Sequence, residues 1–205
     1  MRTNLYIDAF NLYYRCLKGT RFKWLDLGKM CSLLLPQHEV RRIRYFTARV
    51  EARPDDPQQP QRQQTYLRAL ATVPNLSIHY GSFLTKPKRL PLAHPKPGEP
   101  RTVEVLRTEE KGSDVNLATH LLVDGFKRDY DVAVVISNDS DLKGPIEAVR
   151  SELGQTVGVV IPGNLPRSAL PADFYKRIRS GILAASQFPG TLRDQHGTIR
   201  KPKGW

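Results

Sequence analysis

The chain has little cysteine, few acidic side chains and no long apolar run, and each shortage excludes a class of protein. Its two cysteines, Cys16 and Cys31, have no metal-site spacing and cannot form a disulfide framework. No apolar run approaches the roughly 20 residues that a membrane-spanning helix needs. Asp8 interrupts the stretch that would have to be apolar in a signal peptide. We therefore expect a soluble cytoplasmic protein with no membrane partner.

Positive charge is what the chain has in excess. Among 205 residues, 32 Lys and Arg stand against 20 Asp and Glu, which gives a formal net charge of +12. Such an excess is informative about partners rather than about the fold. Nucleic acid is the leading polyanionic partner, an anionic membrane surface comes second, and a generally cationic solvated surface is the third interpretation. The length fits one domain with one sizeable core.

Strand and helix patterns alternate along the chain. Strands are predicted at residues 5–8, 41–50, 76–83, 132–136 and 156–161, and helices at about 25–35, 58–72, 113–126 and 142–153. This alternation predicts an α/β fold with a mostly parallel sheet covered by helices on both faces. Ligands of such sheets gather at the carboxyl ends of the strands.

Two stretches depart from this pattern. Residues 86–101 hold five prolines, so we expect a Pro-rich basic insertion at about 84–107, with a short strand at 102–106, inside a domain spanning 1–182. Residues 183–205 are expected to form a basic, flexible tail. Five cations of these stretches are predicted to hold phosphates without reading bases, although solvated loop charge is the alternative for each: Lys86, Lys88, Arg89, Arg200 and Lys201.

Acidic residues stand where a ligand site is expected. Asp8 ends the first predicted strand, and Asp139 and Asp141 follow the buried strand 132–136. Asp114 falls in the first turn of a predicted helix, with Ser113 as its expected N-cap. Asp114 and Asp141 also have a simpler interpretation as helix-start residues. Right-handed crossovers would nevertheless bring the ends of the first and fourth predicted strands close together.

Carboxylates gathered at one place favour a hard cation. Mg²⁺ and Mn²⁺ select oxygen ligands, whereas a Zn²⁺ site would be expected to include His or Cys. Such a cation activates water and neutralises the charge that develops when a phosphodiester is hydrolysed. Without a cation, three neighbouring carboxylates repel one another and their pKa values rise.

Four segments together resemble the NYN domain family, PIN-like nucleases that include the LabA/DUF88 group. The segments are residues 7–11 (IDAFN), residues 110–114 (EKGSD), residues 136–141 (ISNDSD), and the closing set of Ser168, Leu170, Ala172, Asp173 and Phe174. The resemblance spans roughly residues 3–180. Asn138 stands where the family more often has Gly, and Leu142 where it usually has Phe, but neither departure removes a carboxylate.

The resemblance implies a three-layer PIN-like (Rossmannoid) fold and a metal-dependent ribonuclease, expected to be an endoribonuclease. It implies Mg²⁺, with Mn²⁺ as the alternative, and RNA as the substrate, with DNA and a homodimer left open. Asp8, Asp114 and Asp139 would be catalytic and bind the metal, and Asp141 would be a fourth catalytic acid or a water-mediated ligand. The expected substrate-binding residues are Lys111, Ser137, Asn138 and Asn11, and Asn11 would either orient Asp8 or contact the substrate.

The same residues bear on four other functions. A catalytically inactive RNA-binding module on the same fold stays open. A dinucleotide-binding oxidoreductase would need a Gly-rich loop where the chain has Asp8 to Leu12. A phosphatase with an Asp nucleophile would need an acid at position 10, which is Phe10. A phosphoacceptor receiver domain would leave the basic excess unexplained.

Overall fold

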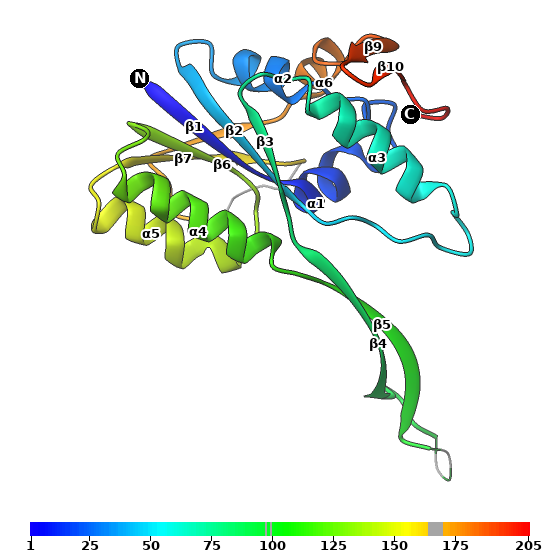
Figure 1. Cartoon of the computed structure of the whole chain (residues 1–205). Helices are drawn as coiled ribbons and strands as arrows, with labels where there is room; N and C mark the ends of the chain where they lie inside the picture. The colour runs from blue at the N-terminus through cyan, green and yellow to red at the C-terminus, as the bar shows by residue number, and fades with distance from the viewer. Residues whose placement is uncertain (97, 99, 164–169) are drawn as a thin grey trace.

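A six-stranded, fully parallel sheet in the order β3-β2-β1-β6-β7-β8 forms the centre of the molecule (Figure 1). The computed structural model describes residues 1–96, 98, 100–163 and 170–205. The strands are β1 (Arg2–Asp8), β2 (Glu39–Thr47), β3 (Leu76–Tyr80), β6 (Val132–Ile136), β7 (Thr156–Ile161) and β8 (Phe174–Arg177). All five residues of β6 are buried, as expected for a central strand covered on both faces. The predicted α/β fold is confirmed.

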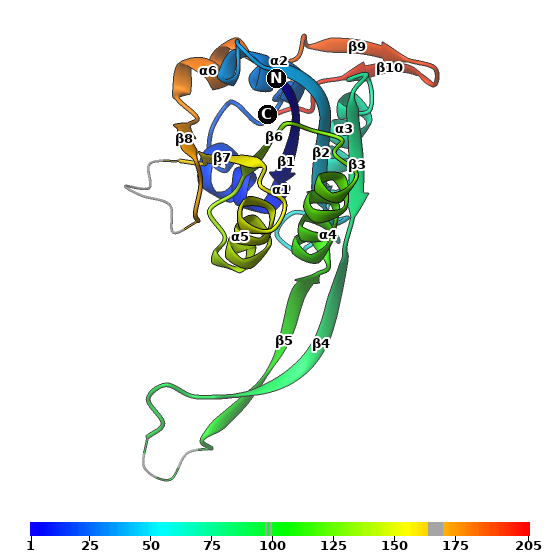
Figure 2. The same cartoon turned by 90° about the vertical axis from the view of Figure 1, so that its left-hand side faces the viewer.

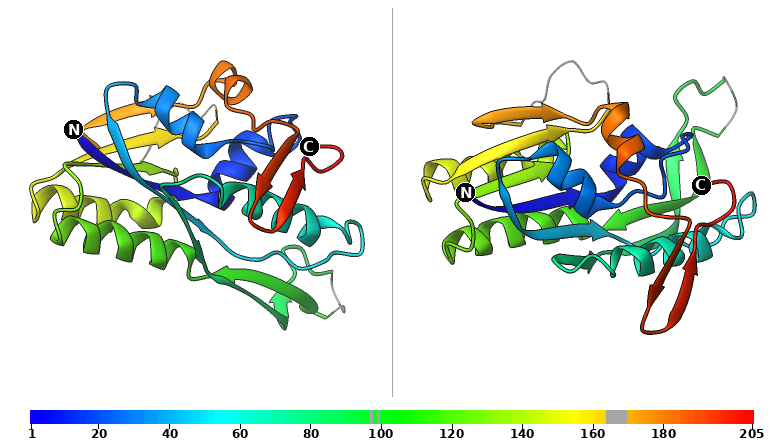
Figure 3. Two further views of the ribbon diagram at one scale, coloured as in Figure 1. Left: turned by 45° about the horizontal axis from the view of Figure 1, so that its top comes forward. Right: turned by 90° about the horizontal axis from the view of Figure 1, so that it is seen from above.

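Helices cover both faces of this sheet, which makes three layers (Figure 3). The helical segments are α1 (Ala9–Leu12), η1 (Tyr13–Leu17), α2 (Leu27–Leu34), α3 (Gln59–Leu70), α4 (Ser113–Phe126), η2 (Ser140–Leu142), α5 (Lys143–Ser151) and α6 (Ser180–Ala185). Alternate residues of β1 point to opposite faces, so Leu5 and Ile7 pack with α2 and α3, whereas Tyr6 packs with α4 and α5. No helix in the described ranges is long and apolar enough to cross a membrane.

The strand order reverses direction at β1. From β1 the chain builds β2 and β3 on one side, and later β6, β7 and β8 on the other. The register sets Ile7 beside Ile136, so the carboxyl ends of β1 and β6 are neighbours. An open α/β sheet binds its ligands at such a switch point. Asp8 is the last residue of β1, and Asp139 follows β6 closely.

The predicted insertion is a long β-hairpin. β4 (Ser82–Pro91) and β5 (Thr102–Lys111) pair antiparallel along their whole lengths and project from the body as an arm (Figures 1 and 2). The predicted strand at 102–106 is therefore longer than expected and runs on almost to α4. Because β4 follows β3 closely, the arm joins the edge of the sheet directly to the start of α4.

The C-terminal segment differs from the flexible tail that the sequence predicts. Residues 183–205 include the end of α6 and a hairpin of β9 (Thr191–Asp194) and β10 (Gly197–Arg200). Phe188 and Ile199 are buried in the main core, and Trp24 Nε1 donates to the Pro189 carbonyl at 2.8 Å. A few apolar side chains thus anchor a segment whose overall composition is polar.

A histidine pair lies between β3 and α4. His79 stacks on Phe46 with ring centroids 5.0 Å apart, and its centroid is 4.2 Å from that of His120. Burial, together with the neighbouring His120 and Arg44, lowers the pKa of His79 to about 4, although Asp124 opposes the shift. The folded protein therefore keeps His79 neutral at pH values where an unfolded chain would protonate it.

This pKa shift predicts a loss of stability in mild acid. Between pH 6.5 and about 4, the unfolded state binds the His79 proton and the folded state does not, so the free energy of unfolding falls as the pH falls through this window. We expect His79→Gln to flatten that part of the curve of melting temperature against pH, followed by circular dichroism. A curve with the same slope in both proteins would contradict the prediction.

Candidate metal centre

Three aspartates that lie far apart in the sequence meet at the switch point. One carboxylate oxygen each from Asp8, Asp114 and Asp139 lies within 4.8 Å of the other two. Asp8 comes from the end of β1, Asp114 from the first turn of α4, and Asp139 from the loop after β6. The three acids that the sequence predicts as metal ligands are thus brought together.

Hydrogen bonds hold Asp8 in a fixed orientation. Its Oδ1 accepts from the backbone N–H of Asn11 at 2.9 Å, which makes Asp8 the N-cap of α1. Its Oδ2 accepts from the buried Ser137 hydroxyl at 2.8 Å. Burial raises the pKa of Asp8 despite these hydrogen bonds. A nearby cation would therefore stabilise the charged form of Asp8.

The loop after β6 is tied to the same carboxylate. The Ser137 hydroxyl oxygen accepts from the Asp139 N–H at 3.0 Å, and Asn11 Oδ1 accepts from the Asn138 N–H at 3.3 Å. Asp139 caps η2 by accepting from the N–H of Asp141 at 3.0 Å. The backbone N–H of Asn11 thus orients Asp8, which is one of the two roles expected for Asn11, and Asn11 also lines the cleft onto which the carboxylates open. The Ser137 hydroxyl lies in the same place and contacts both Asp8 and Asp139.

The start of α4 places the third acid. Gly112, with φ +94°, is the N-cap, in place of the predicted Ser113, because Ser113 is already the first helical residue. Ser113 donates to Glu110 from its backbone N–H at 3.0 Å and from its hydroxyl at 2.6 Å. Burial raises the pKa of Asp114 to about 6, and the negative charges of Asp8, Asp139 and other nearby acids add to this rise.

The donor set fits a hard divalent cation. The three facing groups are all carboxylates, as Mg²⁺ and Mn²⁺ prefer. Burial raises the pKa values of Asp8 and Asp114, and the negative charges of the neighbouring carboxylates add to the rise. A bound cation would remove this mutual repulsion.

The carboxylates open onto a cleft of about 450 Å³. Two arginines, Arg15 and Arg53, also line this cleft, together with Glu110. Sequence reasoning missed all three as site residues. Glu110 belongs to the EKGSD segment that carries the family resemblance, so its nearness to Asp114 in the sequence is a signal for it. Arg15 and Arg53 carried no such signal, since only the tertiary fold brings them to the cleft.

Several predicted site residues lie outside this cleft. Asp141 is exposed and is not part of the three-oxygen cluster, and Lys111 Nζ pairs with Glu109 at 3.0 Å. The cations predicted to hold phosphates lie on the arm or at the C-terminal hairpin, and none lines the cleft: Lys86, Lys88, Arg89, Arg200 and Lys201. Ser168, part of the family resemblance, falls outside the described residues.

Gly81, between β3 and β4, lies against the turn that starts α4. A Cβ at this position would lie 2.4 Å from Glu110 Oε1, 2.6 Å from the Lys111 carbonyl and 2.9 Å from the Ser113 N–H. Gly81→Ala should therefore displace the Glu110–Ser113 turn and shift Asp114. We expect at least about tenfold weaker Mn²⁺ binding by isothermal titration.

Gly144→Ala is the matched control, because an added Cβ there meets nothing within 4 Å in α5. Binding of Mn²⁺ should be unchanged in this variant, and alanine should stabilise the helix by about 0.5–1 kcal/mol. Equal Mn²⁺ affinity in both variants would show that the turn does not position Asp114.

Comparison with known proteins gives a curated relative, a solved structure with a similar fold and a family match. The 6-hydroxy-3-succinoylpyridine 3-monooxygenase HspA of Pseudomonas putida is 32% identical over 237 residues, covering 100% of this chain and 75% of HspA. The crystal structure of a protein of unknown function from Vibrio parahaemolyticus superimposes with a TM-score of 0.52 at 18% identity, covering 87% of this chain and 93% of that one, which shows a shared fold. The NYN domain matches residues 2–175. The chain therefore belongs to the NYN domain family.

Proposed function

We propose that this protein is a metal-dependent ribonuclease that hydrolyses RNA phosphodiester bonds internally. The observation that carries the proposal is the cluster of Asp8, Asp114 and Asp139, whose oxygens lie within 4.8 Å of one another at the switch point. NYN domains belong to the PIN-like nucleases, and this one carries a net charge of +12. A carboxylate cluster in a basic protein suits a polyanionic substrate that needs a cation at the reacting phosphate.

The residues of the candidate site would have separate roles in the cleavage of RNA. Asp8, Asp114 and Asp139 would hold Mg²⁺ or Mn²⁺, which when bound supplies an activated water and neutralises charge at the scissile phosphate. Ser137 keeps the carboxylate of Asp8 turned toward the cleft through its 2.8 Å hydrogen bond. Arg15 lines the same cleft and would pair with a phosphate oxygen of the strand.

The arm is proposed to hold flanking phosphates. Lys86, Lys88 and Arg89 are exposed on β4, on a hairpin that projects from the body (Figure 2). Cations on such a hairpin attract a phosphate backbone without reading bases, so RNA affinity should fall steeply with salt. We assign the same role to Arg200 and Lys201 at the C-terminal hairpin.

The proposal is tested with purified protein on a labelled single strand of RNA, a stem-loop RNA and a DNA strand of the same sequence. Internal cleavage of RNA is expected with Mg²⁺ or Mn²⁺, and none with a chelator. Binding without cleavage under all conditions would identify the catalytically inactive RNA-binding module instead. Equal cutting of the DNA strand would widen the substrate class to both nucleic acids.

A monooxygenase is the second candidate, favoured by HspA, to which the whole chain aligns at 32% identity. Such a reaction consumes O₂, two electrons and two protons, placing one oxygen atom on the substrate and releasing the other as water. The test supplies 6-hydroxy-3-succinoylpyridine and a reduced nicotinamide cofactor and follows O₂ consumption. Uptake that depends on the pyridine would favour this candidate, and no uptake would remove it.

A further inference from the structure

A second, smaller cavity lies directly beside the acidic cleft. It has a volume of about 80 Å³ and shares Phe10, Tyr14, Val50 and Gln59 with the lining of the cleft. By the same measure one water needs roughly 10–15 Å³, so the cavity has room for several waters or one flat ring. A group bound there would be next to a group bound at the carboxylates.

Aromatic side chains dominate the walls of this cavity, which we call the ring pocket. They are Phe10, Tyr13, Tyr14, Tyr45, Tyr66 and Trp205. Four segments supply them: the α1–η1 segment, β2, α3 and the C-terminal segment. Trp205 of the C-terminal segment packs against Tyr66 of α3, with ring centroids 5.6 Å apart. Aromatic walls of this kind bind planar rings by stacking.

The ring pocket also contains an unsatisfied polar atom. Gln59, the first residue of α3, lines both the pocket and the cleft, and its Oε1 is buried without a hydrogen-bond partner in the described part of the chain. The other glutamine of the pocket, Gln63, is satisfied, because its Nε2 donates to the Ala48 carbonyl and its Oε1 accepts from Val50 N–H. A buried oxygen without a donor is costly, so Gln59 is placed to accept from a ligand N–H.

We propose that the ring pocket holds one nucleobase of the RNA strand whose phosphate lies at the three carboxylates. The inference rests on the proposed ribonuclease function and extends it to a base-binding subsite. Unstacked bases of single-stranded RNA are recognised by stacking on aromatic rings and by hydrogen bonds to their polar edges. Tyr14, which is 50% exposed, stands at the mouth and stacks on the base, while Gln59 accepts from its edge.

Binding is measured in a chelator, so that the test does not depend on cleavage. The probes are fluorescein-labelled pentauridylate and pentaadenylate and an abasic pentamer of the same backbone, with free uridine as a competitor, and the readout is fluorescence anisotropy. Tyr14→Ala should weaken binding of a base-bearing pentamer by about 5- to 150-fold. Gln59→Leu should weaken it by about 2- to 10-fold.

The matched control is Tyr175→Ala, because Tyr175 is 49% exposed on β8 and does not line the pocket. This variant should bind as the unchanged protein does. In unlabelled titrations, the base-bearing pentamers should also quench the fluorescence of Trp205, one of only two tryptophans, and Trp205→Phe should lose that quenching.

Two results would contradict the proposal that the ring pocket binds a base. One is equal binding of the abasic and base-bearing pentamers, and the other is unchanged affinity in both Tyr14→Ala and Gln59→Leu. Displacement by uridine at the affinity of the pentamers would assign the pocket to a free heterocycle instead of a strand. The two proposals can fail separately. Base-dependent binding without metal-dependent cleavage would support the ring pocket and contradict the ribonuclease. Metal-dependent cleavage without base-dependent binding would support the ribonuclease and contradict the ring pocket.

Discussion

Replacing Asp139 by asparagine is expected to reduce metal-dependent RNA cleavage at least about 100-fold while the protein stays folded. The carboxylate oxygens of Asp8, Asp114 and Asp139 lie within 4.8 Å of one another, so the change removes one of three charges that would hold the cation. Loss of a residue that merely orients a metal ligand typically lowers metal affinity or activity by about 10- to 100-fold. Loss of a ligand itself should lower activity further. Initial rates on a labelled RNA measure the effect.

The fold should tolerate this substitution because Asn caps a helix about as well as Asp. Asp139 caps η2 through the N–H of Asp141, and an asparagine oxygen can accept the same hydrogen bond. Removing one negative charge from the cluster also relieves repulsion at Asp114. Without metal, the melting temperature of the variant should equal or exceed that of the unchanged protein, and Mn²⁺ should raise it less.

Asp55→Asn provides a charge-matched control, since Asp55 is exposed and does not line the cleft. Its cleavage rate should match that of the unchanged protein. Cleavage retained in Asp139→Asn at the level of this control would assign the activity to another nuclease in the preparation and would remove the proposed function.

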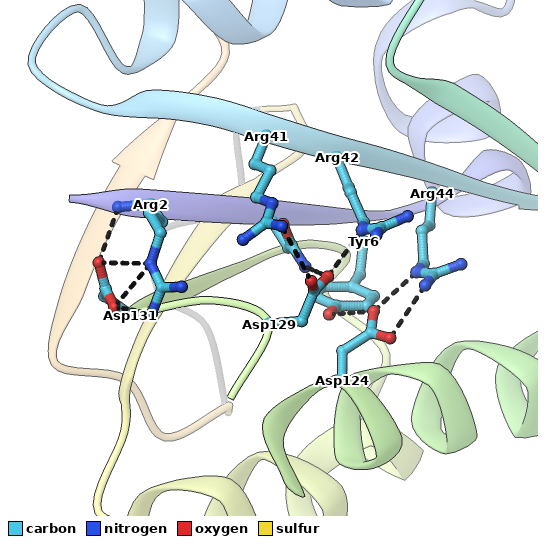
Figure 4. Close-up of polar contacts among 9 residues, drawn as sticks. Arg2, Tyr6, Arg41, Arg42, Arg44, Asp124, Asp129 and Asp131 are labelled. Carbon is cyan, nitrogen blue, oxygen red and sulfur yellow. Dashed lines mark hydrogen bonds and ion pairs between the residues drawn. The ribbon is translucent and has the colours of Figure 1, made fainter. Parts of the chain in front are cut away.

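The second large effect concerns stability, and we expect Asp124→Ala to lower the free energy of unfolding by about 3–5 kcal/mol. Figure 4 shows Asp124 of α4 facing Arg44 of β2 and Tyr6 of β1. Arg44 donates to both carboxylate oxygens, at 2.7 and 2.9 Å, and the Tyr6 hydroxyl donates at 2.8 Å. The side chains of Arg44 and Asp124 are only 13% and 6% exposed, so removing the acid leaves a guanidinium and a hydroxyl poorly solvated.

An exposed pair in the same view is the control. Arg2 and Asp131 form an ion pair at 2.7 Å, but each side chain is 44% exposed (Figure 4). Water replaces such an interaction at little cost, so Asp131→Ala should lower the free energy of unfolding far less than Asp124→Ala does. Urea unfolding followed by circular dichroism measures both variants. A loss below about 1 kcal/mol in Asp124→Ala would show that the buried pair is not a principal link between α4 and the sheet.

The parts of the fold that could be predicted are those with a local signal. The strands Val132–Ile136 and Thr156–Ile161 and the helix Ser113–Phe126 occur at the predicted residues, because each has an unbroken apolar run or helical spacing between clear boundaries. The gathering of Asp8, Asp114 and Asp139 could be predicted for a related reason. Each follows a strand or starts a helix, and the ends of parallel strands meet at one edge.

What could not be predicted depends on pairings between distant residues. Arg15 and Arg53 reach the cleft only through the tertiary fold, and the docking of Phe188 and Ile199 is hidden by the polar composition around them. The sequence predicts the arm as an insertion, but its proline content gives no sign of the register in which β4 and β5 pair.

A crystal soaked in MnCl₂ and measured at the manganese edge tests the central claim most directly. The account predicts an anomalous peak within roughly 2.5 Å of carboxylate oxygens from Asp8, Asp114 and Asp139. The same soak of Asp139→Asn should show a much weaker peak there. Crystals that bind Mn²⁺ only elsewhere, with these three carboxylates free of metal, would contradict the account.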